Sequence, residues 1–228
     1  MRPGLPCVVV AIALECAIAC GSLGCGDDVV AADSGATDDA PMDDAGPRIV
    51  ERQLMPSAPP IAPATECRVT LTDEIVPIHG HVPDCSAMTY PDSPPLSGMH
   101  YGTWAAFATK YSMPVPWGFL VHDMEHGAVV LLHNCPSGCP EVLAEYDRLL
   151  AEFGPDPVCT ASIRNRIIIM PDPSLDVPVA ATAWGHSYRA TCFDRASLDA
   201  FVSASYALGP ENQCAQGADL SLIGWCSM

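Results

Sequence analysis

Apolar residues occur in four short runs that predict β-strands. Residues 67–78 alternate imperfectly between polar and apolar positions and include several β-branched side chains. Residues 128–133, 166–170 and 177–188 are mostly apolar, and turn-forming glycine, proline or asparagine residues separate them from the rest of the chain. Apolar runs of this length between turn residues are typical of strands in a protein core.

Two other segments predict helices, because their apolar residues recur every three or four positions. The first covers 141–153 and ends before a Gly-Pro pair, which stops helices. The second extends from Asp194 or Ser197, either of which suits the N-cap position, to Tyr206. A short helix is also predicted over 104–111, before two closely spaced prolines.

The order of these elements predicts an α+β domain. After residue 127 the chain reads strand, helix, strand, strand, helix. A turn at 171–176 joins the last two strands and predicts a hairpin. We therefore expect a small antiparallel or mixed sheet with helices packed on one face. Residues 79–102, rich in proline, glycine and histidine, predict a long structured loop.

The first 25 residues have the pattern of a signal peptide. Arg2 gives a positive start, and residues 5–14 are almost wholly apolar. This run is too short to cross a bilayer core of roughly 30 Å as a helix. Cys25, directly before an aspartate-rich segment, is the expected lipidation site, with Cys20 as the second candidate. We therefore expect an extracytoplasmic protein, either a lipoprotein of the bacterial cell envelope or a secreted protein.

Acidic residues divide the rest of the chain into a tether and a domain. Residues 26–66 hold seven Asp, two Glu and two Arg, so their net charge is −7, and they contain no aromatic residue. A segment of this composition is expected to be an extended, disordered tether. Residues 67–228 carry the remaining −10 of the total of −17 and suit a single globular domain. Nucleic acid and anionic lipid surfaces are poor partners for this charge.

The cysteines also fit an oxidising compartment. Beyond the signal segment the chain has eight cysteines, an even number that allows up to four disulfides. Cys135 and Cys139 flank a short loop and are one candidate pair, and Cys214 with Cys226 is another near the C-terminus. A zinc–thiolate site is the weaker alternative, because no second pair of closely spaced cysteines is present.

The segment 120–127 has the pattern most indicative of a functional site. It places two histidines and a glutamate within five residues, directly before a predicted strand. Three more histidines lie upstream, one of them on a Ser-Gly-Met-His turn. Gathered neutral imidazoles most often bind a transition metal. We therefore expect one metal ion, with ligands His100, His122 and His126 and with His81 as a candidate fourth ligand.

Copper and zinc are the metals that this set favours, because both accept imidazole. Thioethers select copper in its reduced state, although methionine also fills irregular cores. Four methionines lie in or near the loop region: Met88, Met99, Met113 and Met124. We expect Glu125 to be either a ligand or, slightly preferred, an acceptor that fixes an imidazole tautomer.

Two other functions stay open at this point. The order His122, Glu125, His126 matches the inverted zinc-protease signature, in which the glutamate activates zinc-bound water. That signature needs a helix that continues past the second histidine, whereas Gly127 and a strand-like run follow here. A metal-dependent hydrolase with Glu125 as general base is therefore the alternative. A metal-free, disulfide-stapled interaction module is the third interpretation.

The ordered motifs of the folded region resemble those of a bacterial family known as domain of unknown function 3105 (DUF 3105). The similarity extends over residues 78–212 and rests on the motifs at 90–91, 94–101, 121–127, 170–173, 175–176, 182–185 and 209–211. The resemblance implies no particular activity. Its histidine motifs correspond here to His81, His100, His122 and His126, with Glu125 beside them, and Met99 stands where proline is expected.

Overall fold

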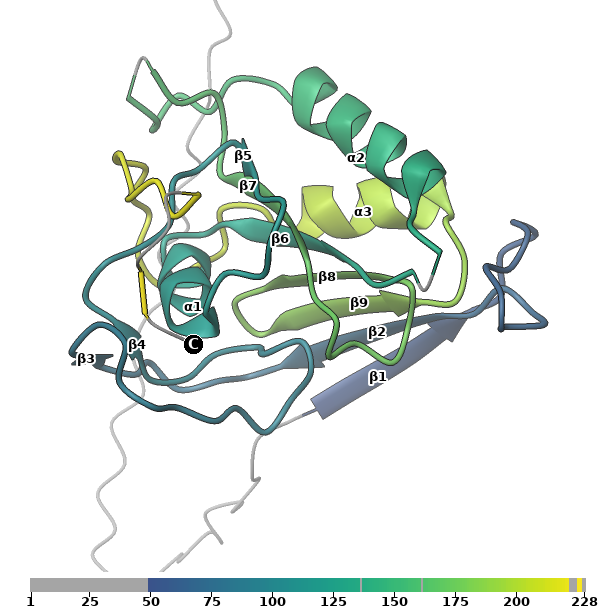
Figure 1. Cartoon of the computed structure of the whole chain (residues 1–228), viewed down its shortest axis with the longest axis horizontal. Helices are drawn as coiled ribbons and strands as arrows, with labels where there is room; N and C mark the ends of the chain where they lie inside the picture. Colours follow the sequence, from purple (N-terminus) through teal and green to yellow (C-terminus); the bar gives the residue numbers. More distant parts are fainter. Residues whose placement is uncertain (1–48, 136, 161, 222–224, 227–228) are drawn as a thin grey trace, which may run out of the picture. The chain divides into compact units, whose positions relative to one another are not determined.

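The structure, a computed structural model, describes residues 49–135, 137–160, 162–221 and 225–226 (Figure 1). The signal segment with Cys20 and Cys25, and residues 26–48 of the expected tether, lie outside this part. The helices are α1 (Trp117–Glu125), α2 (Pro140–Glu152) and α3 (Arg195–Ser205). The strands are β1 (Ile49–Leu54), β2 (Val69–Glu74), β3 (His81–Val82), β4 (His100–Tyr101), β5 (Thr109–Lys110), β6 (Val129–His133), β7 (Ile167–Pro171), β8 (Val179–Ala183) and β9 (His186–Ala190).

Seven strands form one mixed sheet in the order β1-β2-β9-β8-β6-β7-β5, which confirms the predicted α+β fold. β7 pairs parallel with β5 and β6, and the other neighbours are antiparallel. The hairpin lies elsewhere than predicted, because β6 separates β7 from β8 and the segment 177–188 contains two strands. Gly185 turns the chain between β8 and β9 with a φ of 75°, a conformation open to glycine.

Alternate side chains of the central strands fill a core on each face of the sheet. Val129 and Leu131 of β6 pack in one core with residues of α2 and α3, whereas Val130 and Leu132 pack in the other with residues of α1. Figure 1 shows α2 and α3 together and α1 apart from them. The expectation of helices on one face thus applies to α2 and α3, while α1 covers the opposite face.

The short helix predicted over 104–111 is wrong, and α1 was not predicted. Residues 104–106 are extended and exchange backbone hydrogen bonds with Ala218, and the segment ends in β5. α1 begins directly after Pro116, and eight of its nine residues are buried. It therefore lacks the polar face that makes an amphipathic helix recognisable in a sequence.

The sheet begins inside the segment whose composition predicts a tether. β1 pairs antiparallel with β2, from Ile49 opposite Glu74 to Leu54 opposite Val69. All six residues of β1 are exposed. Backbone hydrogen bonds, rather than apolar burial, hold this edge strand in place. A composition argument counts only apolar surface, so it cannot detect such a strand.

Four disulfides link the eight cysteines beyond the signal segment. Cys135–Cys139 is the local bridge expected from its spacing. The expected Cys214–Cys226 pair is wrong, because Cys214 is bonded to Cys159 and Cys226 to Cys85. The remaining pair, Cys67–Cys192, ties the neighbouring strands β2 and β9 together near their ends. Separations of 55 to 141 residues place these partners beyond any local pattern.

Candidate metal centre

Two short parallel strands bring His81 and His100 together. His81 of β3 lies opposite His100 of β4 in the strand register, and their ring centroids are 4.7 Å apart. The long loop predicted over 79–102 therefore folds so that its two ends meet. The His100 side chain is fully buried and the His81 side chain is 51% exposed, so the cluster reaches the surface at His81.

Helix α1 supplies the other three side chains. His122 and Glu125 lie on its last turns and His126 is its C-cap residue, so the three share one side of the helix. Gly127 follows with a φ of 85°, and a Cβ there would lie 2.8 Å from the Ala207 backbone. The helix therefore ends at the second histidine, and the continuation that the inverted zinc-protease signature requires is not formed.

The last carbonyl groups of α1 are held by distant parts of the chain. The Glu211 backbone N–H donates to the Glu125 carbonyl at 2.9 Å, and the buried Arg166 guanidinium donates to the His126 carbonyl at 2.6 Å. A Cβ on Gly209 would overlap the Glu125 carbonyl, so this close approach requires glycine. These contacts satisfy groups that lack partners within a helix and fix the direction of its last turn.

The potential ligand atoms form two overlapping groups. One ligand atom from each of His81, His100 and His122 lies within 4.8 Å of the others, and the same is true of His122, Glu125 and His126. The structure therefore gathers all five residues, but it joins His81, rather than His126, to His100 and His122. His126 belongs to the second group, with its ring centroid 4.5 Å from that of His122.

Backbone carbonyls set the tautomers of His100 and His122. His100 Nδ1 donates to the Gly98 carbonyl at 2.8 Å, and His122 Nδ1 donates to the Tyr101 carbonyl at 2.7 Å. A carbonyl oxygen only accepts, so each neutral ring carries its proton on Nδ1 and keeps a lone pair on Nε2. An imidazole in this state, with its other nitrogen anchored, is ready to bind a metal ion.

Glu125 lies among these nitrogens and is 3% exposed. Its Oε2 atom is 2.9 Å from His100 Nε2 and 3.8 Å from His81 Nε2. An ionised carboxyl group and an imidazole lone pair have no hydrogen to share, so a proton or a metal ion must lie between them to make the contact attractive. This geometry suits Glu125 as a direct ligand more than as the tautomer-fixing acceptor, because backbone carbonyls already perform that role.

Burial lowers the pKa of both His122 and His126 to about 4. Loss of hydration is the largest cause for each ring, and repulsion from neighbouring histidines adds to it. The Arg166 charge lowers the pKa of His126 further. Both rings are therefore uncharged at neutral pH, which is the form that donates a lone pair to a metal.

His126 is buried with one nitrogen lacking a partner. Its Nε2 atom is 3.0 Å from the Gln213 amide nitrogen and 3.4 Å from Glu211 Oε2. Its Nδ1 atom has no hydrogen-bond partner within the described residues. The Trp104 ring packs against both His122 and His126, at centroid distances of 5.1 and 5.0 Å. The Gln213 amide nitrogen only donates, so His126 Nε2 accepts and the neutral ring carries its proton on the unpartnered Nδ1.

Sequence reasoning missed Gln213 and Asp123. Gln213 reaches His126 across 87 residues, so no local pattern marks it. Asp123 follows His122 directly and accepts a hydrogen bond from the Ala105 N–H at 3.1 Å, while its Oδ1 atom is buried without a partner in the described ranges. Burial raises the pKa of Asp123 well above its ordinary value. Asp123 could have been predicted from the sequence, because it is a second acidic residue within the same motif as Glu125.

The methionines give copper little support. Met124 is fully buried in the apolar core beneath α1, and Met113 is 63% exposed. Met88 and Met99 line a separate pocket of about 450 Å³ together with Tyr90, which donates hydrogen bonds to the Met88 sulfur and the Met99 carbonyl. Among the other histidines, His186 bonds to Asp73 at 2.8 Å and so has a structural partner.

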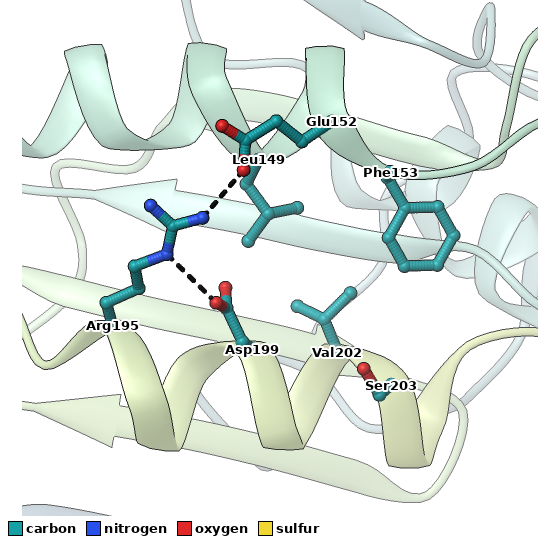
Figure 2. Close-up of a pocket in the computed structure, with 7 residues that line it drawn as sticks. All are labelled: Leu149, Glu152, Phe153, Arg195, Asp199, Val202 and Ser203. Atoms are coloured by element: carbon teal, nitrogen blue, oxygen red, sulfur yellow. Dashed lines mark hydrogen bonds and ion pairs between the residues drawn. The ribbon is translucent and has the colours of Figure 1, made fainter.

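A cavity of about 220 Å³ between α2 and α3 is a weaker candidate site (Figure 2). Figure 2 shows Arg195 between Glu152 and Asp199, at hydrogen-bond distances of 2.7 and 3.1 Å. These acids balance the arginine charge, and Leu149 and Val202 complete an apolar wall. The cavity thus offers no free ligand atom comparable to those of the histidine cluster.

Fold and site define an α+β, disulfide-bonded protein with a buried histidine–carboxylate cluster. The model of the family described as "Protein of unknown function (DUF3105)" matches residues 81–218, more than half of the chain, so the protein belongs to this family. Neither the curated proteins nor the solved structures contain a match. The four disulfides are consistent with an extracytoplasmic location. None of the helices in the described ranges is long and apolar enough to span a membrane.

Proposed function

We propose that this protein binds a transition metal ion, copper or zinc, outside the cytoplasm. His100 and His122 supply Nε2 atoms to the ion, and His81 and Glu125 complete its coordination. One observation carries the proposal: two backbone carbonyls accept from Nδ1 of the buried His100 and His122 rings, and a ligand atom of each ring lies within 4.8 Å of one of His81. His126, which the sequence suggested as a ligand of this same ion, falls instead in the group with His122 and Glu125.

A metal accounts for this arrangement better than hydrogen bonding alone. With neither a proton nor a metal ion between them, the lone pair of His100 Nε2 and the Glu125 carboxylate would repel each other at 2.9 Å in a buried site. A divalent ion removes this repulsion and gains ligands that are already oriented. Three imidazoles and one carboxylate suit zinc, or copper in its oxidised state, because neither requires a thioether.

Elemental analysis tests this function directly. The full chain is purified without chelator, loaded with one equivalent of Zn²⁺ or Cu²⁺, and freed of unbound metal. We expect the protein to retain the ion and the double variant His100→Ala/His122→Ala to lose it. His186→Ala is the matched control, because His186 pairs with Asp73 in β2 and should not change retention. Equal retention by the double variant would refute the site.

A metal-dependent hydrolase with Glu125 as general base is the less favoured candidate. In its favour, Glu125 is buried beside two imidazoles, where a metal-bound water would also lie. Glu125→Gln distinguishes the two functions, since an amide cannot act as a base. Hydrolysis of peptide or ester substrates that disappears in this variant with metal content unchanged would favour the hydrolase.

We also propose that the chain is a lipoprotein anchored at Cys25. The support is the apolar segment at 5–14, the aspartate-rich segment after Cys25 and the four disulfides of the folded part. Metabolic labelling with palmitate in a bacterial host tests it. We expect Cys25→Ala to abolish labelling and Cys20→Ala to leave it intact, and the opposite result would move the anchor.

A further inference from the structure

His81 is the most exposed of the four proposed metal ligands. Its side chain is 51% exposed, whereas the His100 and Glu125 side chains are 0% and 4% exposed and His122 is buried. Backbone carbonyls hold the rings of His100 and His122, but no hydrogen bond holds the His81 ring within the described residues. An outside group can therefore replace His81 on the ion with the least disturbance of the buried ligands.

A pocket of about 450 Å³ lies beside the segments that lead into β3 and β4. One wall comes from the segment 74–79, which precedes β3, and another from residues 97–99, which precede β4 directly. The second wall contains Gly98, whose carbonyl accepts the hydrogen bond from His100 Nδ1. The pocket therefore shares its walls with the part of the backbone that positions the metal ligands.

Three large apolar side chains are exposed on the segments that form these walls. Ile75 is 73% exposed, Ile78 is 72% exposed and Met99 is 42% exposed. The pocket between the segments is itself lined by apolar side chains such as those of Met88 and Tyr90. Exposed apolar side chains around a pocket indicate a protein-binding surface, in which the pocket receives a large side chain of the partner.

Acidic residues give this pocket a negative charge. Glu74 and Asp92 line it, and neither forms an ion pair within the described residues. None of the described lining residues is a lysine or an arginine. The net charge of the whole chain, −17, has the same sign. Opposite charges steer a partner to such a surface and like charges repel it, so the pocket suits a partner with basic side chains.

Resting on the proposed function, we propose that this pocket and its rim dock a partner protein that exchanges the metal ion at His81. The docking surface consists of Glu74, Ile75, Ile78, Tyr90, Asp92 and Met99. The partner carries apolar and basic side chains, and it presents an imidazole or a carboxylate to the ion. As this donor atom binds, the bond between the ion and His81 breaks, and the oxidation state of the ion does not change. The buried ligands hold the ion during this first exchange.

Release of zinc in the presence of a synthetic peptide tests the docking surface. The zinc-loaded full chain is mixed with the peptide Leu-Lys-Leu-Lys-Trp-His and with excess EDTA, which takes up the released ion. A peptide with glutamate in place of both lysines is the control. We expect the basic peptide to accelerate release about tenfold more than the acidic one. The rate should level off at high peptide concentration, because docking precedes exchange. Elemental analysis after rapid gel filtration measures the zinc that remains bound.

Variants assign the effect to the docking surface. Glu74→Gln/Asp92→Asn should remove most of the acceleration and leave the zinc content unchanged. The matched control Glu141→Gln/Asp147→Asn, on α2, should keep the acceleration. His81→Ala should release zinc to EDTA alone about tenfold faster than the natural protein does.

The outcomes separate the docking surface from the metal site. Equal acceleration by the two peptides, acceleration undiminished in Glu74→Gln/Asp92→Asn, or release unchanged in His81→Ala would overturn the exchange at the docking surface and keep the metal site. A natural chain that takes up no zinc would overturn the proposed function and the exchange with it.

Discussion

The two faces of the central sheet differ in the polarity of the side chains that they bury. On the face covered by α2 and α3, apolar side chains such as Leu131, Tyr146 and Val202 fill the core. On the face covered by α1, a similar apolar core ends at a group of buried polar side chains, His100, His122, Asp123, Glu125 and His126. Buried titratable groups cost stability unless they are paired, so their concentration on one face indicates a binding site there.

The largest expected effect concerns metal retention on the α1 face. His100→Ala/His122→Ala removes two buried ligands, and we expect its affinity for Zn²⁺ to fall by more than a hundredfold. Thermal unfolding with and without metal measures this, since an ion that binds only the folded state at 100 times its Kd adds about 2.7 kcal/mol. If Zn²⁺ stabilised this variant as much as the natural protein, the metal site would not lie on the α1 face, and the two faces would not differ in metal binding.

The opposite face should respond in stability alone. Leu131→Ala empties a fully buried position between β6 and the α2/α3 layer, and we expect a loss of about 2–5 kcal/mol in the free energy of unfolding. Metal stoichiometry should not change while the protein stays folded. Denaturant unfolding, paired with elemental analysis of the same sample, provides both readings. Loss of metal in the folded variant would show that the two faces are coupled.

A smaller loss of metal affinity should follow from moving the Gly98 carbonyl, which orients the His100 ring. Gly98 has a φ of 139°, and a Cβ there would lie 2.8 Å from the Tyr90 ring. We expect Gly98→Ala to shift the Gly98 carbonyl and to weaken metal binding about 10–100-fold, as for other groups that orient metal ligands. Gly80→Ala is the matched control, since no atom lies within 4 Å of its added Cβ. Competition against a chromogenic chelator measures both.

The free energy of unfolding of the metal-free protein should decrease gradually in acid, because of two histidines on the α1 face. The folded-state pKa of His122 and His126 is about 4, below the ordinary histidine value of 6.5. Between these two values the unfolded chain binds more protons than the folded one, so metal-free stability falls as pH drops from 6.5 towards 4. Above pH 6.5 this contribution is constant. His122→Gln/His126→Gln should flatten the decline, and an unchanged decline would assign it to other groups.

The sequence predicted the α2/α3 face well and the α1 face incompletely. α2 and α3 follow from the helical period of their apolar residues, and β6 and β7 follow from short apolar runs between turn residues. α1 has no exposed side on which a period can be seen. The cluster residues were found because histidine beside an acid is chemically distinctive. The sequence did not show which of these histidines lie close to one another, because that depends on the β3–β4 pairing and on long-range disulfides.

Anomalous diffraction at the zinc edge, from crystals of the full chain grown with Zn²⁺, tests the central claim most directly. We predict a peak about 2.0–2.1 Å from Nε2 of both His100 and His122, with a Glu125 oxygen also in contact. A cluster with no anomalous peak, or zinc held only by surface side chains, would contradict it.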